Sequence, residues 1–133
     1  MKHLGIKDGK PAPALPSFMG TKSSAVVVVG HSSCGGCAAS LEASQKDRDP
    51  DPMLPSDAPI NTWLAPLVLL ARSLKNPPLP VLVNANVVVQ VENLRKSNTI
   101  KENRGVRVHG WVHNLETGKL EVVPQAGGSE SVE

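Results

Sequence analysis

The chain has 133 residues, of which 40% are hydrophobic, so it is long enough for one ordinary domain with one core. Its 14 basic and 12 acidic residues are interspersed, without the basic runs and interleaved aromatic residues of nucleic-acid grooves, and this excludes nucleic acid as an expected partner. The sequence shows neither a signal peptide nor an apolar stretch that could cross a bilayer, which predicts a cytoplasmic protein with no membrane partner.

The core must be aliphatic, because the chain has one Phe, two Trp and no Tyr. An aliphatic core suits a mainly parallel sheet with flanking helices, so we expect an α/β fold. The two cysteines, Cys34 and Cys37, are too close in sequence to join distant parts of a fold. They indicate metal or redox chemistry in a reducing compartment.

Residues 1–24 differ in composition from the rest of the chain. A short possible helix remnant at Met1–Leu4 precedes Gly9–Ser24, which opens with three prolines within six residues. Prolines at this density exclude regular helix and interior strand. We therefore expect 1–24 to be a helix remnant followed by a Pro-rich insert or disordered loop.

The first clear element is a β-branched run at Ala25–Val29, which ends at Gly30 and predicts a central strand buried on both faces. A turn at His31–Cys37 follows, and good helix formers begin at Ala38. The unit is thus a strand, a glycine-rich turn and a helix. Such a turn lies at the carboxyl end of a parallel sheet, where α/β proteins place their sites.

A proline-rich acidic segment, Asp47–Pro59, predicts a surface loop whose charges are solvated. The next helix is marked by an apolar i, i+3, i+4, i+7 pattern, and Pro66 is compatible with it only near its first turn. This helix is expected to stop before Pro77. Its apolar positions are Leu67, Leu70, Ala71 and Leu74.

A further helix is predicted to begin around Asn84 or Asn86. One set of its residues has helical spacing and is expected to be buried, while a polar set points outward. The expected buried residues are Val87, Val91 and Leu94, and the expected outward residues are Gln90, Glu92, Arg95 and Lys96.

From Val106 the apolar period changes to two, which predicts a strand. A turn at Asn114–Gly118 leads into Lys119–Val123, which completes a hairpin whose second strand lies at an antiparallel edge of the sheet. The domain is therefore assigned to residues 25–123. Residues 124–133 are predicted to form a flexible tail.

Three chemistries could use the His31–Cys37 turn. A serine hydrolase needs Gly-x-Ser-x-Gly, but Cys34 occupies the second glycine position. A dithiol oxidoreductase needs Cys-x-x-Cys at a helix N-terminus, and Cys34 and Cys37 meet that spacing, although His31 then has no role. A zinc site needs imidazole and thiolate donors about 2.0–2.3 Å from one ion, and His31 and Cys34 supply one of each.

Several segments, in order, resemble the β-class carbonic anhydrases. Val26–Gly36 is similar to that family's strand and Gly-His-x-x-Cys-Gly-Gly turn. Trp63–Leu67, Asn86–Arg95 and Val108–Val112 resemble its later helices and strand, and the Thr117-Gly118 turn follows. The match covers about residues 25–123 and is specific as an ordered set.

This resemblance implies a site and a reaction. His31 and Cys34 would be two of the three protein ligands of a catalytic Zn²⁺, and Gly35 and Gly36 would shape the turn. Bound zinc lowers the pKa of water from about 15.7 to about 7, which makes hydroxide available to convert carbon dioxide to bicarbonate. The implied fold is an α/β domain with an antiparallel edge strand, and the implied assembly is a homodimer.

The resemblance also implies that part of the site is missing from this sequence. The family's third zinc ligand and its Asp–Arg catalytic dyad lie in a Cys-x-Asp-x-Arg motif, which residues 1–133 do not contain. We therefore expect a β-carbonic anhydrase-like fold that is incomplete at its N-terminus, with no catalytic dyad. A non-catalytic remnant, or a subunit that associates with a full-length relative, is the alternative.

The remaining candidates are one thiol and two histidines. Cys37 could replace the missing ligand, pair with Cys34, or pack as a small hydrophobic residue. His109 and His113 lie on a predicted strand, where histidine is usually a half-buried structural residue, and they are assigned no chemistry.

Overall fold

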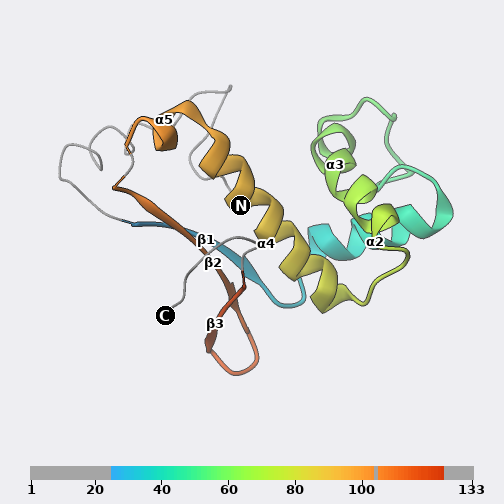
Figure 1. The fold of residues 1–133 in the computed structure, drawn as a ribbon. Helices are drawn as coiled ribbons and strands as arrows, with labels where there is room; N and C mark the ends of the chain where they lie inside the picture. Colours follow the sequence, from blue (N-terminus) through green and yellow to red (C-terminus); the bar gives the residue numbers. More distant parts are fainter. Residues whose placement is uncertain (1–24, 104, 125–133) are drawn as a thin grey trace.

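The computed structural model describes residues 25–103 and 105–124, which form an α/β arrangement of three strands and four helices in that part of the chain (Figure 1). The predictions for residues 1–24 and for 125–133 of the tail lie outside the described residues. The elements follow one another in this order: β1 (Ala25–His31), α2 (Gly35–Lys46), α3 (Pro59–Ser73), α4 (Leu79–Lys96), α5 (Asn98–Lys101), β2 (Arg107–His113) and β3 (Leu120–Val122).

The sheet is small and mixed, with the strand order β1-β2-β3. β1 runs parallel to β2 from the pair Ala25–Arg107 to the pair His31–His113, and β3 adds antiparallel to β2. The predicted hairpin and its antiparallel edge strand are therefore confirmed. The expectation that β1 is a central strand is wrong for the described sheet, because β2 lies between β1 and β3.

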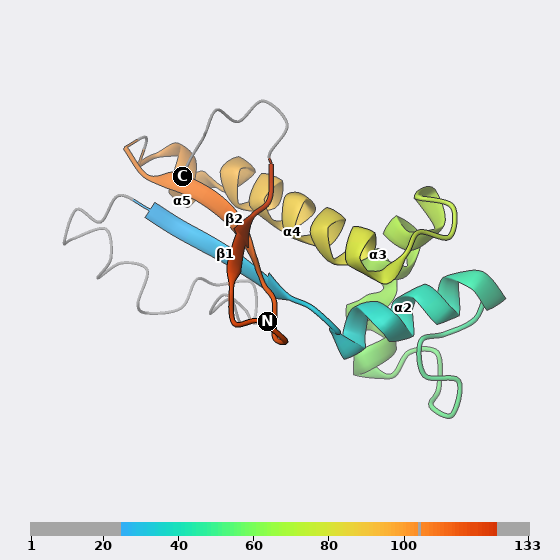
Figure 2. The same ribbon diagram turned by 90° about the horizontal axis from the view of Figure 1, so that it is seen from below.

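One face of the sheet packs against α4, which crosses it in both views (Figures 1 and 2). Val28, Val108 and Val112 point to this face and are buried with α4 residues such as Val87 and Val91. Removing each of these side chains from water contributes about 1.5–3 kcal/mol. The strand alternation thus places the main core between α4 and one face of the sheet.

Among the described residues no helix covers the opposite face, since α4 is the one helix there that contacts the sheet. Val29 on β1 is 48% exposed, and it lies in one row with Trp111 and with Val122, which is 54% exposed. The prediction that β1 is buried on both faces is therefore wrong. A run of valines indicates a strand, but it does not say what covers each face.

Helices α2 and α3 pack together beside the carboxyl ends of β1 and β2 (Figure 2). Pro66 lies inside α3, not in its first turn, because the helix already begins at Pro59. The exposed Pro66 removes one backbone hydrogen bond on the solvent side of the helix. The residues that α3 buries are Asn61, Leu64, Val68 and Ala71, one stripe at helical spacing.

Helix α4 begins at Leu79, five residues before the predicted start at Asn84. Pro80 lies in its first turn, where a proline lacks only an N–H group that would have no helical partner. Val87 and Val91 are buried as predicted, and Leu94 packs partly buried against the same core. Arg95 was expected to point outward, but its guanidinium is partly buried and donates to the Val108 carbonyl oxygen at 3.1 Å.

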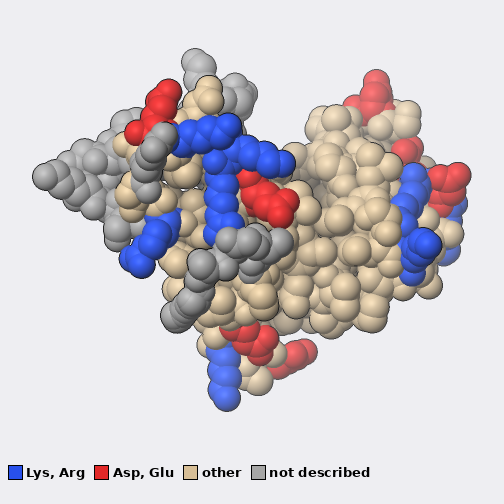
Figure 3. Space-filling view, viewed as in Figure 1, with Lys and Arg blue, Asp and Glu red and all other residues tan. Residues whose placement is uncertain are grey.

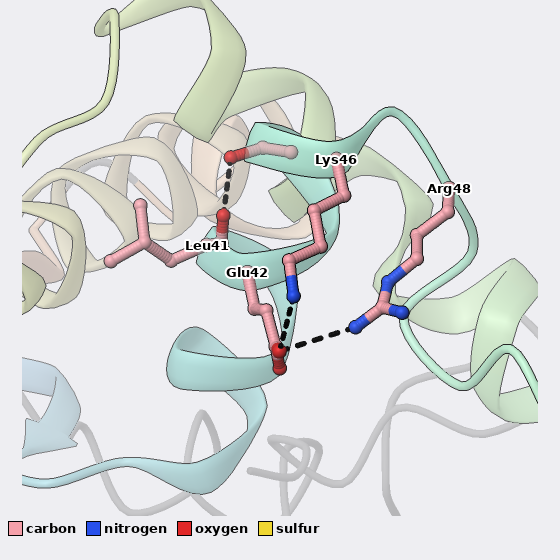
Figure 4. Close-up of polar contacts among 5 residues, drawn as sticks. Leu41, Glu42, Lys46 and Arg48 are labelled. Atoms are coloured by element: carbon pink, nitrogen blue, oxygen red, sulfur yellow. Dashed lines mark hydrogen bonds and ion pairs between the residues drawn. The ribbon is translucent and has the colours of Figure 1, made fainter.

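The predicted surface loop after α2 is confirmed. Asn61 on α3 holds this loop: its Oδ1 accepts from the Asp51 backbone N–H at 2.8 Å, and its Nδ2 donates to the carbonyl oxygens of Asp51 and Pro55. At the end of α2, Glu42 accepts from Lys46 and Arg48 at 3.2 Å each (Figure 4). These exposed ion pairs contribute little to stability.

On the face shown in Figure 3, several Lys and Arg side chains adjoin one another at the end of the molecule where α5 lies, with acidic side chains beside them. None of the helices in residues 25–103 and 105–124 combines the length and the apolar character needed to span a membrane.

Candidate metal centre

His31 ends β1 at the carboxyl end of the parallel strand pair and is exposed. Its Nδ1 donates a hydrogen bond to the Ser32 carbonyl oxygen at 2.9 Å. A carbonyl oxygen only accepts, so this bond requires a proton on Nδ1, and in the neutral ring the lone pair is then on Nε2. A neutral imidazole held in this way is the form of histidine that binds metals.

The turn after His31 is fixed to the end of β2. The Ser32 backbone N–H donates to the His113 carbonyl oxygen at 3.0 Å, and the Ser32 Oγ accepts from the Leu115 backbone N–H at 2.9 Å. Ser33 then has a φ of 55°, a left-handed conformation that is uncommon for a residue with a side chain. Ser32 was missed by sequence reasoning, because its partner is 83 residues away and no local pattern reports such a contact.

Cys34 is the N-cap residue of α2, with an extended backbone, and its carbonyl oxygen accepts the first helical hydrogen bond from Ala38 at 2.9 Å. Its side chain makes no capping hydrogen bond, so the half-buried Sγ is not used by the helix backbone. The positive end of the helix dipole favours an anionic sulfur at this position. Cys34 is therefore placed as a thiolate ligand would be.

Gly35 and Gly36 are the first two residues of α2, and neither has a positive φ. A Cβ at Gly35 would meet no atom within 4 Å, and one at Gly36 would lie 3.6 Å from Leu64 Cδ2 and 3.9 Å from Cys34 Sγ. These are open space and ordinary contacts. The left-handed residue of the turn is Ser33, and a Cβ would fit at either glycine without a clash.

Cys37 is 2% exposed and belongs to the core cluster between α2, α3 and α4. Burial, with smaller contributions from the neighbouring Cys34, raises the pKa of the Cys37 thiol to about 12. Both cysteines are free thiols. Cys37 is thus a buried thiol that keeps its proton at neutral pH, next to a more accessible one.

The two histidines assigned no chemistry, His109 and His113, are both half-buried on β2, as expected for strand histidines. His113 is the register partner of His31. In residues 25–103 and 105–124, no three His, Cys, Asp or Glu side chains are close enough together to hold a metal ion. The described residues therefore bring His31 and Cys34 to one turn without a third ligand.

The family profile described as carbonic anhydrase matches residues 18–120. The chain belongs to the carbonic anhydrase family, in its β class. It is 28% identical over 105 residues to carbonic anhydrase 1 of Escherichia coli O157:H7, an alignment that covers 71% of this chain and 44% of the relative. The imidazole and thiolate donors of the turn are ligands that zinc prefers, so the two side chains fit the metal of this family.

Solved β-carbonic anhydrases share the fold. A structure among the tetrameric β-carbonic anhydrases of Sordaria macrospora has a TM-score of 0.62 and 25% identity over 80% of this chain. The enzyme CafA of Aspergillus fumigatus gives 0.61 and 24% over the same share. The chain spans 55% and 51% of those two proteins, and thus about half the length of the carbonic anhydrases it matches.

Proposed function

We propose that His31 and Cys34 are two protein ligands of a catalytic Zn²⁺, in a β-carbonic anhydrase site that hydrates carbon dioxide reversibly to bicarbonate. The observation that carries this proposal is the turn itself. It presents an imidazole with a free Nε2 and a thiol with no capping bond, three residues apart, at a helix N-terminus. Family membership supplies the reaction.

Zinc in such a site lowers the pKa of a bound water to about 7 and so supplies hydroxide at neutral pH. The chain's own residues would hold the zinc and orient its ligands. The Ser32 carbonyl oxygen fixes the His31 ring through Nδ1, and the helix N-terminus stabilises the Cys34 thiolate. A Cβ at Gly36 would lie 3.9 Å from the Cys34 sulfur, so glycine keeps that space beside the sulfur free.

The 133-residue chain by itself is proposed to be an incomplete enzyme. Tetrahedral catalytic zinc has three protein ligands, and the described residues contribute two. The sequence also lacks the Cys-x-Asp-x-Arg motif that its resemblance to the family calls for. The alternative, a non-catalytic chain or a subunit that associates with a full-length relative, is supported by the same two observations.

The proposed assembly is a homodimer, or a pairing with a full-length relative, in the cytoplasm. The open sheet face supports an interaction with a partner, since it exposes Val29, Leu120 and Val122 at 48–54%. The free thiols of Cys34 and Cys37 agree with a reducing compartment. Tetramers are known among the related fungal enzymes.

The test is zinc binding by the purified chain, measured by competition with a chromophoric chelator. We expect binding of one zinc that is lost when His31→Ala or Cys34→Ser is introduced. Ser44→Ala, a substitution on the same helix away from the turn, is the control and leaves binding unchanged. Zinc binding that survives both ligand substitutions would show that the metal site is elsewhere.

A dithiol oxidoreductase is the second candidate, and one observation favours it. Cys34 is half-buried at the helix N-cap, while Cys37 is buried with its pKa raised to about 12, an arrangement that also suits an attacking and a resolving thiol. We expect no catalytic disulfide reduction, because that reading leaves His31 without a role. Turnover of a disulfide substrate that disappears in Cys34→Ser and in Cys37→Ser alike would favour this candidate over zinc.

A further inference from the structure

The two outer edges of the described sheet differ. β3 has three residues, contains Glu121 and is closely followed by Pro124, and these are features that keep a sheet edge from pairing with another chain. β1 has seven residues, pairs with β2 in an unbroken register without a bulge, and contains neither a charged residue nor a proline. The described sheet is therefore protected at the β3 edge and unprotected at the β1 edge.

The direction of the backbone groups of β1 follows from the turn after it. The Ser32 backbone N–H donates to the His113 carbonyl oxygen at the end of β2. Backbone groups of successive strand residues point to opposite sides, so the odd-numbered residues of β1 direct their N–H and C=O groups away from β2. These residues are Ala25, Val27, Val29 and His31. Among the described residues no strand lies on that side, so the four present a row of groups that can bond another strand.

A second copy of β1 matches this row. When two copies run antiparallel about a two-fold axis at Val28, Val27 lies opposite Val29 of the other copy, and Ala25 lies opposite His31. Each outward-directed residue then meets an outward-directed residue, and the hydrogen-bonded pairs of an antiparallel ladder form along the whole strand. No charged side chain meets its own copy, because the strand has none. Such a contact is self-complementary and closes at two chains.

We propose that β1 pairs antiparallel with β1 of a second copy, so that two three-stranded sheets become one continuous sheet. This inference rests on the homodimer of the proposed function, to which it gives a surface, and it does not depend on the zinc site. Residues directly opposite each other in a sheet lie on the same face. Val27 and Val29 of both copies therefore form one apolar strip on the face that no described helix covers.

Sedimentation equilibrium of the 133-residue chain, whose mass is 14.0 kDa, tests the proposal. Val29→Pro removes an outward N–H and leaves the bonds between β1 and β2 intact, since proline is tolerated where a strand N–H faces outward. Val122→Pro is the matched control on the β3 edge. The Val123 N–H donates to the Gly110 carbonyl oxygen, so the Val122 N–H points away from β2 as well.

We expect the parent chain and Val122→Pro to sediment with twice the mass of one chain. Val29→Pro is expected to raise the dissociation constant of the dimer about tenfold or more, because two N–H···O bonds are lost and the ring lies where the second strand approaches. Circular dichroism shows that each variant is folded.

A pair of double variants tests the register without changing the backbone. Val27→Lys with Val29→Lys places like charges directly opposite each other in the proposed dimer, which destabilises strand pairing. Val27→Lys with Val29→Glu places opposite charges there instead. We expect the first double variant to sediment as a monomer at concentrations where the second remains a dimer.

The contrary results separate this inference from the proposed function. A parent chain that stays monomeric overturns the inference and the homodimer, while the zinc site is measured separately by chelator competition. A dimer that dissociates no more readily in Val29→Pro than in Val122→Pro overturns the inference and leaves the homodimer standing. Dissociation of the Lys–Glu variant together with the Lys–Lys variant overturns it too, by indicating that the copies meet through the uncovered faces of their sheets or that another partner fits the edge.

Discussion

At the scale of single residues, the two thiols of the chain differ in access although they are three positions apart. Cys34 lies at the helix N-cap with a half-buried sulfur, and Cys37 lies within the core. Solvent therefore reaches Cys34 more readily than Cys37, which is 2% exposed. Substitutions of the two cysteines are therefore expected to have different effects.

Replacing Cys34 by Ser is expected to cost far more zinc binding than replacing Cys37 by Ser. The first change removes a thiolate ligand, whereas the second keeps a small donor in the core. Chelator competition on the two variants measures the difference, with the parent chain as reference. Equal losses would indicate a Cys-x-x-Cys metal or redox site in place of the His-x-x-Cys site.

Gly30 is required by packing between β1 and α4. A Cβ at this position would lie 2.7 Å from Val87 Cγ2, closer than side chains tolerate without movement, while its 3.5 Å distance from Val83 Cγ1 would be an ordinary contact. Gly30→Ala is expected to lower the free energy of unfolding by about 1–3 kcal/mol, the usual cost of overpacking. Urea denaturation measures it.

Gly105→Ala is the control for this substitution, since a Cβ at Gly105 would meet no atom within 4 Å. Equal urea midpoints for Gly30→Ala and Gly105→Ala would show that α4 does not approach β1 as closely as in the structure.

At the scale of elements, Asn61 joins α3 to the acidic loop that follows α2. Its side chain is 2% exposed and makes three hydrogen bonds to the backbone of Asp51 and Pro55. Asn61→Ala leaves these buried groups without partners, and we expect a loss of about 1–3 kcal/mol in the free energy of unfolding.

The loop around Asp51 is expected to become more mobile in this variant, so that trypsin cleaves faster after Arg48. Thr62→Ala, at an exposed neighbouring position of α3, is the control and leaves the cleavage rate unchanged. Equal cleavage rates in the two variants would show that other contacts hold the loop.

The elements that sequence reasoning placed well are those whose signal is local. The valine run of β1, the alternation of β2 and the turn before β3 are patterns of a few residues, and each strand starts within one residue of its predicted start, although β1 continues to His31, which was predicted to lie in the turn. The start of α3 was missed because Pro66 was expected only in a first turn, whereas the helix tolerates it on a solvent-facing side. The start of α4 was placed too late, at Asn84 or Asn86, although a proline such as Pro80 is compatible with a first turn.

The candidate site also contains some residues that a local sequence pattern identifies and some contacts that no local pattern reports. His31, Cys34 and the glycines follow one another along the chain, so a motif could identify them. The tie between Ser32 and Leu115 and the burial of Cys37 depend on segments that meet only in the fold. Neither the exposed face of β1 nor its place at one side of the described sheet can be read from a hydrophobic run, since such a run does not specify its neighbours.

At the scale of the whole molecule, the described chain combines a turn with two proposed zinc ligands and a sheet that a described helix covers on one face. α4 buries one side, while Val29 and Val122 on the other side are about half exposed. A single layer of helix on a sheet leaves apolar surface that partners commonly cover. The proposed activity of the isolated chain therefore depends on which group supplies a third zinc ligand and on what covers the exposed face of the sheet.

The isolated 133-residue chain is expected to hydrate carbon dioxide poorly or not at all. His31 and Cys34 leave half of a tetrahedral zinc shell to water, which weakens binding compared with a site of three protein ligands. No Asp–Arg pair from a Cys-x-Asp-x-Arg motif is present to orient the hydroxide that zinc would supply.

Stopped-flow hydration with a pH indicator measures the rate on zinc-loaded chain, with metal-free chain as the blank. The comparison is a version extended by a segment that carries Cys-x-Asp-x-Arg, which is expected to be faster by orders of magnitude. Fast, zinc-dependent hydration by the 133-residue chain alone would show that another of its groups completes the site, and the same assay on Cys37→Ser would then test whether that group is Cys37.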